Sequence, residues 1–426
     1  MIPLFYQSLW RDEAFSFFLA LKSPLEIISL TALDYSPPLY YTLLHYWTTL
    51  FGETELSLRS LSLLFHLGSV FVSSLIIHKL TNKWLGALLT SLAVLLNPYL
   101  IHYAFETRMY TMLAFLILTS TWFLLNKKHL LSGLFAALAI FTHNYATFYL
   151  ISLVLILLLT ENQKPKLMGF FKLILLPILA LGSWASIVLS QWSRIESSFW
   201  LSKPTFISLL GTFHSYIIGH SSYVFGNYLF YTSLATILLA IFSWKFSKIR
   251  LPLNKVLMPA ALILPVVLSI IVSLTITPIY HDRYLISTLY LAILSIGYVL
   301  STETFTHPLV QSLKTVLITT YLATLIPTSI YTLQTPLSQP IKDSVSFISN
   351  QKKGSVAVAE NALNFLETKY YFRQYNLDIP VYVFSENGSI PSYIGSVVFD
   401  KKDIITTLPD RDYWSINARG GAHYVP

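Results

Sequence analysis

The stretch Trp10-Arg11-Asp12-Glu13-Ala14-Phe15-Ser16 places two adjacent carboxylates just ahead of a long, mostly apolar sequence. A second polar and aromatic stretch, Asp34-Tyr35-Ser36-Pro37-Pro38-Leu39-Tyr40-Tyr41, follows before the long apolar runs begin. Ionisable groups are costly inside a bilayer and are usually functional there. These carboxylates therefore either lie in water at the membrane edge or are retained for chemistry.

The composition is that of a polytopic membrane protein. Hydrophobic residues make up 54% of the chain and charged residues only 11%, and the mean hydropathy is +0.60. A soluble domain carries about a quarter of charged residues. The net charge of +8 does not indicate nucleic acid as a partner, because the basic residues stand singly or in short groups between apolar runs, as orientation signals do. The absence of cysteine excludes disulfides and thiolate metal sites.

The apolar runs predict about ten transmembrane helices. A run of about 20 residues crosses the hydrocarbon core, and the run over residues 129–160 is long enough for two shorter helices that part at His143-Asn144. The aromatic segment 37–51 begins with Pro-Pro and predicts an interfacial helix lying on the membrane. The other spans are predicted at residues 57–78, 84–102, 109–126, 169–192, 226–244, 256–277, 284–301 and 312–331.

Basic residues in the connections predict sidedness, because Lys and Arg are retained on the cytoplasmic side. The less basic set of alternate loops holds only Arg108, Arg194, Lys203 and Arg283. Ten alternating spans then place the opening stretch and the tail outside the cell. The more basic, cytoplasmic set comprises Lys79, Lys83, Lys127, Lys128, Lys164, Lys166, Lys172, Lys245, Lys248, Arg250 and Lys255.

The tail changes in composition and predicts a separate small domain. Residues 355–358, 380–384 and 396–399 have the pattern of short β-strands, and residues 361–375 have that of a helix. We therefore divide the chain into a transmembrane domain over residues 1–335, with a first external loop over 1–56, and an extracytoplasmic α/β domain over 336–426. The predicted fold class is an all-α polytopic membrane protein with this small α/β domain.

The polar residues of the membrane part gather on the predicted external side. They are Asp12-Glu13, Asp34, Glu106-Thr107-Arg108, His143-Asn144 and His281-Asp282-Arg283-Tyr284. A carboxylate such as Asp12 can act as a general base toward an acceptor hydroxyl, and arginines can bind a phosphate through their fork of donors.

Each of these residues also has a structural interpretation. Asp12 could be a helix N-cap, and the sequence does not show which of Asp12 and Glu13 would be the cap and which the base. Arg108, Arg283 and Arg59 could be helix-end arginines at the lipid headgroups, and Arg108 could pair with Glu106. His143, at a helix break, could be a hydrogen-bonded structural residue.

The order of the motifs resembles a known family. Trp-Arg-Asp-Glu-Ala at 10–14 and the stretch at 34–41 are followed by Phe51-Gly52-Glu53-Thr54-Glu55, Leu58-Arg59-Ser60-Leu61-Ser62, Asn97-Pro98 and Glu106-Thr107-Arg108-Met109-Tyr110. This order closely resembles the bacterial GT-C glycosyltransferases of the protein O-mannosyltransferase and aminoarabinose transferase type. The resemblance is strongest over about residues 8 to 150, and Asp282-Arg283-Tyr284-Leu285 is a weaker match.

The resemblance implies a sugar transferase of the bacterial plasma membrane with an extracytoplasmic site. It implies Asp12 as the catalytic base supported by Glu13, and Arg108, with Arg283 and Arg59, as ligands of a polyprenyl-phosphate sugar donor. Further candidate substrate-binding residues are Glu106, Asp34, His143 and Tyr110. In that family a transmembrane helix precedes the acidic pair, and an in-frame apolar stretch of about twenty codons upstream of Met1 would supply such a helix here.

The physical logic agrees with the resemblance. A lipid phosphate is a good leaving group, so the enzyme needs a base, cations and a groove for the lipid, and a single displacement would invert the anomeric centre. No Gly-rich nucleotide loop or clustered metal-ligand motif is visible, so no cofactor is required, although a divalent metal stays possible. The acceptor could be a glycan, a lipid or a protein. A transporter or flippase, or an inactive scaffold of the same fold, stays an alternative.

Overall fold

The computed structural model describes residues 2–160, 163–198, 201–220, 224–246, 253–302, 308–335, 340–351, 353–391 and 394–426. Contacts divide the chain into two compact units. The first, called the sheet unit, comprises Met1–Leu61, Gln191–Trp200 and Thr335–Pro426, and the second, called the helix unit, comprises Ser62–Ser190 and Leu201–Gln334. The opening segment is thus grouped with the tail by its contacts, whereas the sequence-based division at residue 335 follows hydropathy and stays a prediction.

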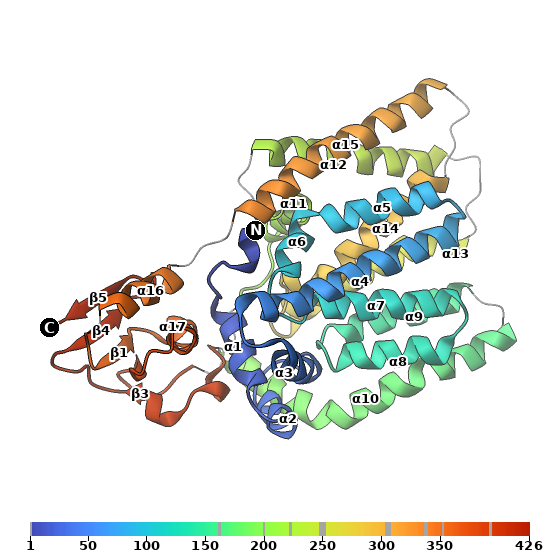
Figure 1. Cartoon of the computed structure of the whole chain (residues 1–426). Helices are drawn as coiled ribbons and strands as arrows, with labels where there is room; N and C mark the ends of the chain where they lie inside the picture. The colour runs from blue at the N-terminus through green and yellow to red at the C-terminus, as the bar shows by residue number, and fades with distance from the viewer. Residues whose placement is uncertain are drawn as a thin grey trace. The chain divides into compact units, whose positions relative to one another are not determined.

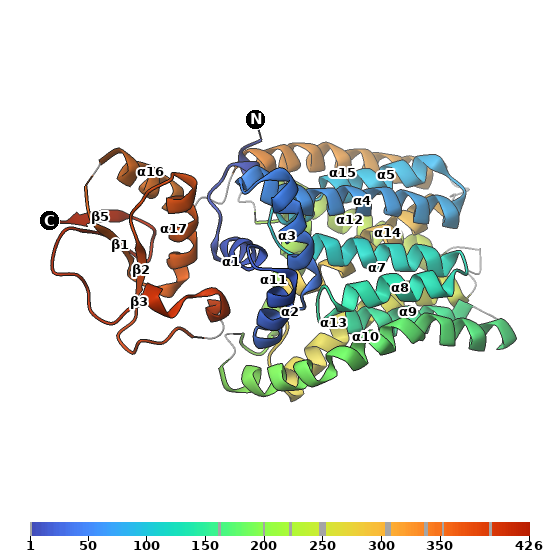
Figure 2. The same ribbon diagram turned by 60° about the horizontal axis from the view of Figure 1, so that its bottom comes forward.

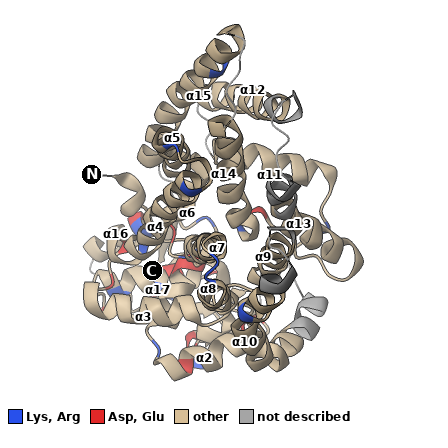
Figure 3. Ribbon diagram, turned by 90° about the vertical axis from the view of Figure 1, so that its right-hand side faces the viewer, with Lys and Arg blue, Asp and Glu red and all other residues tan. Residues whose placement is uncertain are grey.

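The helix unit is a bundle of apolar helices that run alongside one another (Figures 1 and 2). Most of its ribbon carries no charged residue (Figure 3). Its helices are α4 (Glu55–Thr81, whose first residues belong to the sheet unit), α5 (Trp84–Leu96), α6 (Pro98–Ala104), α7 (Tyr110–Leu125), α8 (His129–Ile140), α9 (Ala146–Thr160), α10 (Gln163–Ser198, whose last residues belong to the sheet unit), α11 (Phe206–Ile218), α12 (Val224–Phe246), α13 (Leu253–Thr275), α14 (Ile286–Thr302) and α15 (Pro308–Gln334).

Several of these helices are long and apolar enough to cross a membrane. Among the described residues five meet that condition, and the bent pair α5 and α6 raises the number to six. The predicted break at His143-Asn144 is confirmed, since α8 and α9 are separate helices. The full set of ten crossings stays a prediction. The side chains of Lys164, Lys166, Arg194, Lys245, Lys248, Arg250 and Lys255, used above for sidedness, lie outside the part that the structure describes.

The structure refines two predictions for this unit. The span predicted over residues 84–102 corresponds to α5 and α6, which together are apolar enough for one span but meet at 62°. Asn97 caps α6 by accepting a hydrogen bond from the backbone N–H of Leu100 at 3.0 Å, and Pro98, which has no N–H, suits a first helical turn. The external loop predicted before residue 226 contains α11, which is shorter than a crossing and was therefore missed.

The sheet unit begins with a segment that is more helical than predicted. A 3-10 helix, η1 (Pro3–Phe5), is followed by α1 (Arg11–Ala20), α2 (Pro24–Leu33) and α3 (Leu39–Phe51). α3 confirms the helix expected over residues 37–51, and its place on the membrane stays a prediction. α2 begins with a capping box, in which Ser23 accepts from the N–H of Glu26 while the Glu26 carboxylate accepts from the N–H of Ser23.

The tail forms a five-stranded sheet in the order β3-β2-β1-β4-β5, with only β4 and β5 antiparallel. Its strands are β1 (Val356–Ala359), β2 (Val381–Phe384), β3 (Ile404–Ile405), β4 (Tyr413–Ile416) and β5 (Ala422–Val425), and its helices are α16 (Ile341–Gln351) and α17 (Ala362–Gln374). The strand predicted at 396–399 is wrong: Ser396–Val398 is a 3-10 helix, because Gly395 (φ +81°) turns the chain just before it.

Candidate functional site

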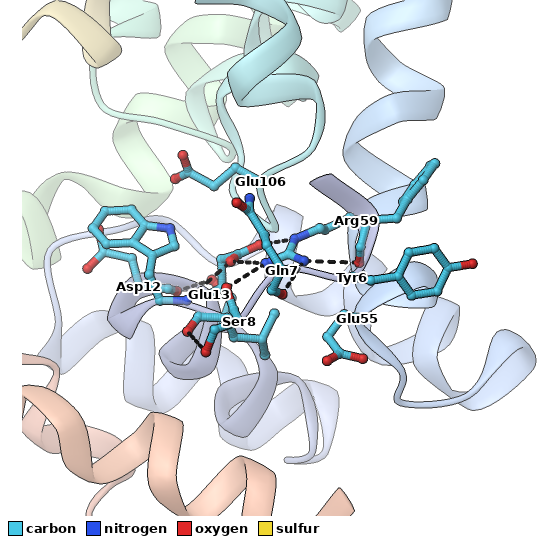
Figure 4. Close-up of polar contacts among 12 residues, drawn as sticks. Tyr6, Gln7, Ser8, Asp12, Glu13, Glu55, Arg59 and Glu106 are labelled. Atoms are coloured by element: carbon cyan, nitrogen blue, oxygen red, sulfur yellow. Dashed lines mark hydrogen bonds and ion pairs between the residues drawn. The ribbon is translucent and has the colours of Figure 1, made fainter. Parts of the chain in front are cut away.

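A buried ion pair organises the opening segment of the sheet unit. Arg59 and Glu13 are each at most 1% exposed, and their side chains meet in two hydrogen bonds, Nε to Oε1 at 2.9 Å and Nη2 to Oε2 at 2.7 Å. The remaining donors of Arg59 reach the carbonyl oxygens of Phe5, Gln7 and Ser8 at 2.8 to 3.1 Å (Figure 4). All five guanidinium N–H groups are therefore used inside the protein.

This geometry separates the roles of the two adjacent carboxylates. Glu13 is buried against Arg59 and also accepts a hydrogen bond from the backbone N–H of Trp10 at 3.3 Å. Asp12 retains 13% exposure, and its Oδ1 lies 3.1 Å from the Nε of Arg11. The structure therefore favours Glu13 and Arg59 as the support of the segment, rather than Arg59 as a phosphate ligand, and leaves Asp12 as the accessible carboxylate.

Asp12 stands in the first turn of α1. The N-cap of this helix is Trp10, so the interpretation of Asp12 as an N-cap is wrong. A carboxylate at this place is stabilised in its ionised form by the positive end of the helix dipole. Asp34, the other candidate of the sheet unit, is the buried C-cap residue of α2. An ionised Asp12 is the form that a general base requires.

Two arginines from distant parts of the chain meet within the helix unit. The guanidinium carbons of Arg108 and Arg283 each lie 5.8 Å from the centre of the Tyr110 ring, and that of Arg283 also lies 5.5 Å from the Tyr284 ring. Both arginines are 8% exposed, and Tyr110 is 1% exposed. Cations over the face of a tyrosine ring are attracted by it. The arrangement concentrates two positive charges in one largely buried place.

Local structure explains how Arg108 and Arg283 are positioned beside the Tyr110 ring. The break at Asn97-Pro98 starts the short helix α6, and Arg108 follows in the turn before α7, with its N–H donating to the carbonyl of Glu106 at 2.7 Å. Arg283 lies in a 3-10 turn, η2 (Asp282–Leu285), whose N-cap is His281. The hydroxyl of Tyr216 donates to the carbonyl of Asp282 at 2.8 Å and fixes this turn.

His143 belongs to the same group. Its ring centre lies 6.0 Å from that of Tyr110 and 5.1 Å from that of Tyr284. Burial, together with the charges of Arg108 and Arg283, lowers the pKa of His143 to about 3, so its imidazole is neutral in ordinary solution. The Oε2 of Glu106 lies 3.6 Å from the Nε2 of His102, and its negative charge also acts on Tyr110.

The structure therefore gathers the predicted residues in two sets. Asp12, Glu13 and Arg59 lie together in the sheet unit, and Arg108, Arg283, Tyr110 and His143 lie together in the helix unit. The sequence analysis named Tyr284 within the motif at residues 281–284 but gave it no role of its own. It missed Glu367, a fully buried carboxyl on α17, for which the sequence offers no signal beyond a helical pattern.

An apolar cavity of about 570 Å³ lies within the helix unit. It follows one face of α5 from Lys83 to Asn97, a path of ~20 Å at 1.5 Å per residue. Asn97 and Tyr216, which fixes the Arg283 turn, line it at the end where α5 stops. The walls between are mainly aliphatic and include Leu89, Ala93, Ile293, Ile296, Ile318 and Leu322.

Within the described ranges, no group of three or more His, Asp and Glu side chains could hold a metal ion. The expectation that no cofactor is required stays a prediction.

Comparison with known proteins gives a fold and no sequence family. No family model and no curated protein matches the sequence. Among solved structures, the chain is similar to ArnT from Cupriavidus metallidurans in the apo state, with a TM-score of 0.63 and 13% identity over 95% of this chain and 87% of that one. The same enzyme bound to undecaprenyl phosphate gives a TM-score of 0.60 and 12% identity over the same shares of both chains.

A third similar structure is the apo oligosaccharyltransferase from Archaeoglobus fulgidus, with a TM-score of 0.50 and 8% identity over 85% of this chain and 60% of that one. All three are glycosyltransferases of the GT-C type. The protein therefore has the GT-C fold, a polytopic helical membrane fold with a small C-terminal α/β domain.

Proposed function

We propose that this protein is a membrane glycosyltransferase that moves a sugar from a polyprenyl-phosphate donor to an acceptor hydroxyl on the extracytoplasmic face. The observation that carries the proposal is the meeting of Arg108 and Arg283 over the Tyr110 ring. Two guanidinium groups that converge on one ring can act together on one anion, and a phosphate suits their planar fork of donors. The similarity to ArnT, which has been solved with undecaprenyl phosphate, supports a lipid phosphate as that anion.

The apolar cavity supports the lipid part of the donor. A polyprenyl chain is apolar and long, and burying its methylene groups is favourable by about 0.8 kcal/mol each. The cavity beside α5 has aliphatic walls and ends near Tyr216, which holds the turn that carries Arg283. We assign the cavity to the prenyl chain and the two arginines to the phosphate.

The proposed reaction is a single displacement. The acceptor oxygen attacks the anomeric carbon while its proton passes to the carboxylate of Asp12, and the bond from that carbon to the phosphate oxygen breaks. The polyprenyl phosphate leaves with the bonding electrons, and Arg108 and Arg283 stabilise its charge. This route inverts the anomeric configuration. A glycan, a lipid or a protein could supply the acceptor hydroxyl, and the lipid bilayer is the environment of the reaction.

The proposal is tested on the full chain in membranes with undecaprenyl-phosphate sugars as donors. Asp12→Asn should lower turnover by about 10²- to 10⁴-fold, as expected for loss of a general base, while donor binding is retained. The exposed Asp378→Asn, on the tail, is the matched control and should change neither. Determining the anomeric configuration of the product tests inversion.

Other outcomes separate the alternatives. Unchanged turnover in Asp12→Asn would remove Asp12 from the mechanism. Donor binding without transfer by the parent protein would favour an inactive scaffold. Movement of the lipid across the bilayer of reconstituted vesicles, without transfer, would favour a flippase.

A further inference from the structure

Helix α17 of the tail holds the opening segment in place within the sheet unit. The Tyr371 hydroxyl accepts a hydrogen bond from the backbone N–H of Leu9 at 2.7 Å, and the Tyr370 hydroxyl donates to the carbonyl of Glu53 at 2.9 Å. The ring of Tyr370 packs edge to face on Phe17 of α1, with ring centres 5.0 Å apart. The acidic segment is therefore positioned by a helix more than three hundred residues further along the chain.

Glu367 lies on the same helix, among residues that face α1. It is 1% exposed, although Glu is almost never fully buried without a partner. Its carboxyl accepts a hydrogen bond from the backbone N–H of Arg11, and its Oε2 has no hydrogen-bond partner in the part of the chain that the structure describes. A buried polar atom without a partner is rare enough to require an explanation.

The charges around Glu367 come mainly from α1, where Arg11, Asp12 and Glu13 act on it. The other elements packed against α17 are α16, β1 and β2. Their titratable groups are Lys342, which pairs with Glu55, together with Asp343 and Tyr382, while β1 has none. On α17 itself, Lys369 pairs with Asp403 and Arg373 with Glu53.

An ionised Glu367 would add a third negative charge beside Asp12 and Glu13. Arg59 neutralises Glu13, and Arg11 pairs with Asp12, so each of the two α1 carboxylates already has its cation. Arg11 is the cation whose charge acts on Glu367 in the part of the chain that the structure describes. Burial is the main cause that raises the pKa of Glu367 to about 8. The positive charge of Arg11 opposes this shift, and the negative charges of Glu13 and Asp12 add to it.

We propose that Glu367 is a positioning residue for the acidic pair: its protonated carboxyl keeps the charges beside Asp12 balanced, and its ionisation displaces α1. This role rests on the proposed function only in that Asp12 is the base. Through Glu367, the C-terminal tail would help to position the catalytic base. Loss of the proton would add a negative charge close to Asp12 at a largely buried position, where like charges repel more strongly than in water.

Infrared spectroscopy of the purified full-length protein tests the proton itself. The parent should show a carboxylic acid band at neutral pH that disappears with a midpoint of about 8. Glu367→Gln should lack this band, and the exposed Glu386→Gln on the same domain should retain it. An identical spectrum and titration in the parent and Glu367→Gln would overturn the proposal, whether or not the protein transfers sugar.

The pH profile of sugar transfer tests the positioning role, because a merely structural residue would lower turnover equally at every pH. Relative to its own turnover at neutral pH, the parent should lose activity with a midpoint of about 8, and Glu367→Gln, which cannot ionise, should lose this alkaline limb. An alkaline limb that is the same in both proteins would overturn the role. If the parent transfers no sugar at any pH, that result counts against the proposed function, and the infrared titration alone decides the protonation of Glu367.

Discussion

The guanidinium of Arg59 meets the carboxylate of Glu13 in two hydrogen bonds, at 2.7 and 2.9 Å, with both side chains shielded from solvent. The pair joins the start of α4 to the first turn of α1 across 46 residues of chain. With its other donors on the carbonyls of residues 5, 7 and 8, Arg59 fixes the backbone just before the acidic pair. The neighbouring Asp12 is therefore presented from a rigid segment.

Breaking this pair should be strongly destabilising. Arg59→Lys cannot reproduce five fixed donors, and it leaves buried carbonyl and carboxylate groups without partners. Because lysine keeps the positive charge, the cost should stay below the about 3–5 kcal/mol of removing one partner of a buried pair outright. We expect a marked fall in the thermal unfolding midpoint of the purified protein.

The same unit offers a matched control. Arg373 and Glu53 form a pair of the same chemistry, with 2.7 Å from Nε to Oε2, but their side chains are 54% and 31% exposed. Exposed pairs contribute about 0–1 kcal/mol, so Arg373→Lys should hardly change the midpoint. Equal effects at the two places would show that burial does not set the strength of the Arg59 pair.

The two arginines over Tyr110 should act as one anion site. Arg108→Gln and Arg283→Gln should each weaken binding of undecaprenyl phosphate by about tenfold to a hundredfold, since a charged hydrogen bond contributes about 1.5–3 kcal/mol. Because both cations would contact one phosphate, the double variant should differ from the sum of the single effects by about 0.5–3 kcal/mol. Strict additivity would show that they bind different groups, and Arg419→Gln, at an exposed place, is the control.

Much of the helix unit could be predicted because a membrane span has a strong signal in hydropathy. The break at α5 and α6 was not predicted, although Asn97-Pro98 is an N-cap followed by a residue that suits the first turn. α2 was likewise missed, although Ser23, Pro24 and Glu26 form a capping box. These signals lie in three or four residues, and hydropathy averaged over a span hides them.

The site was only partly predictable for a different reason. The residue types of Asp12, Arg108 and Arg283 suggested their chemistry, but the role of Arg59 depends on carbonyls more than fifty residues away. Glu367 likewise becomes unusual only through its contact with α1. Such roles arise from tertiary contacts between distant segments, which one sequence does not record.

The folded protein should lose stability as the pH rises through the range in which Glu367 ionises. Its pKa in the folded protein is about 8, above the ordinary value of 4.5, so its contribution is fully present below about 4.5 and is lost as the pH approaches and passes about 8. The unfolding midpoint should therefore fall between these values, and Glu367→Gln should flatten that slope. The same slope in the parent and the variant would contradict this prediction, and Glu386→Gln should follow the parent.

Filling the cavity beside α5 should select against long donor chains. Ala93 lines the cavity and is 8% exposed, whereas Leu88, on the same helix, does not line it and is 55% exposed. Ala93→Phe would occupy the space of several methylene groups of a prenyl chain. At about 0.8 kcal/mol for each methylene group displaced, binding of undecaprenyl phosphate should weaken by about tenfold or more. Inorganic phosphate, which has no prenyl chain, should bind as before, and Leu88→Phe should affect neither ligand. If Ala93→Phe weakened the binding of both ligands equally, the cavity would not hold the prenyl chain. The effect would then arise from disturbed packing of α5.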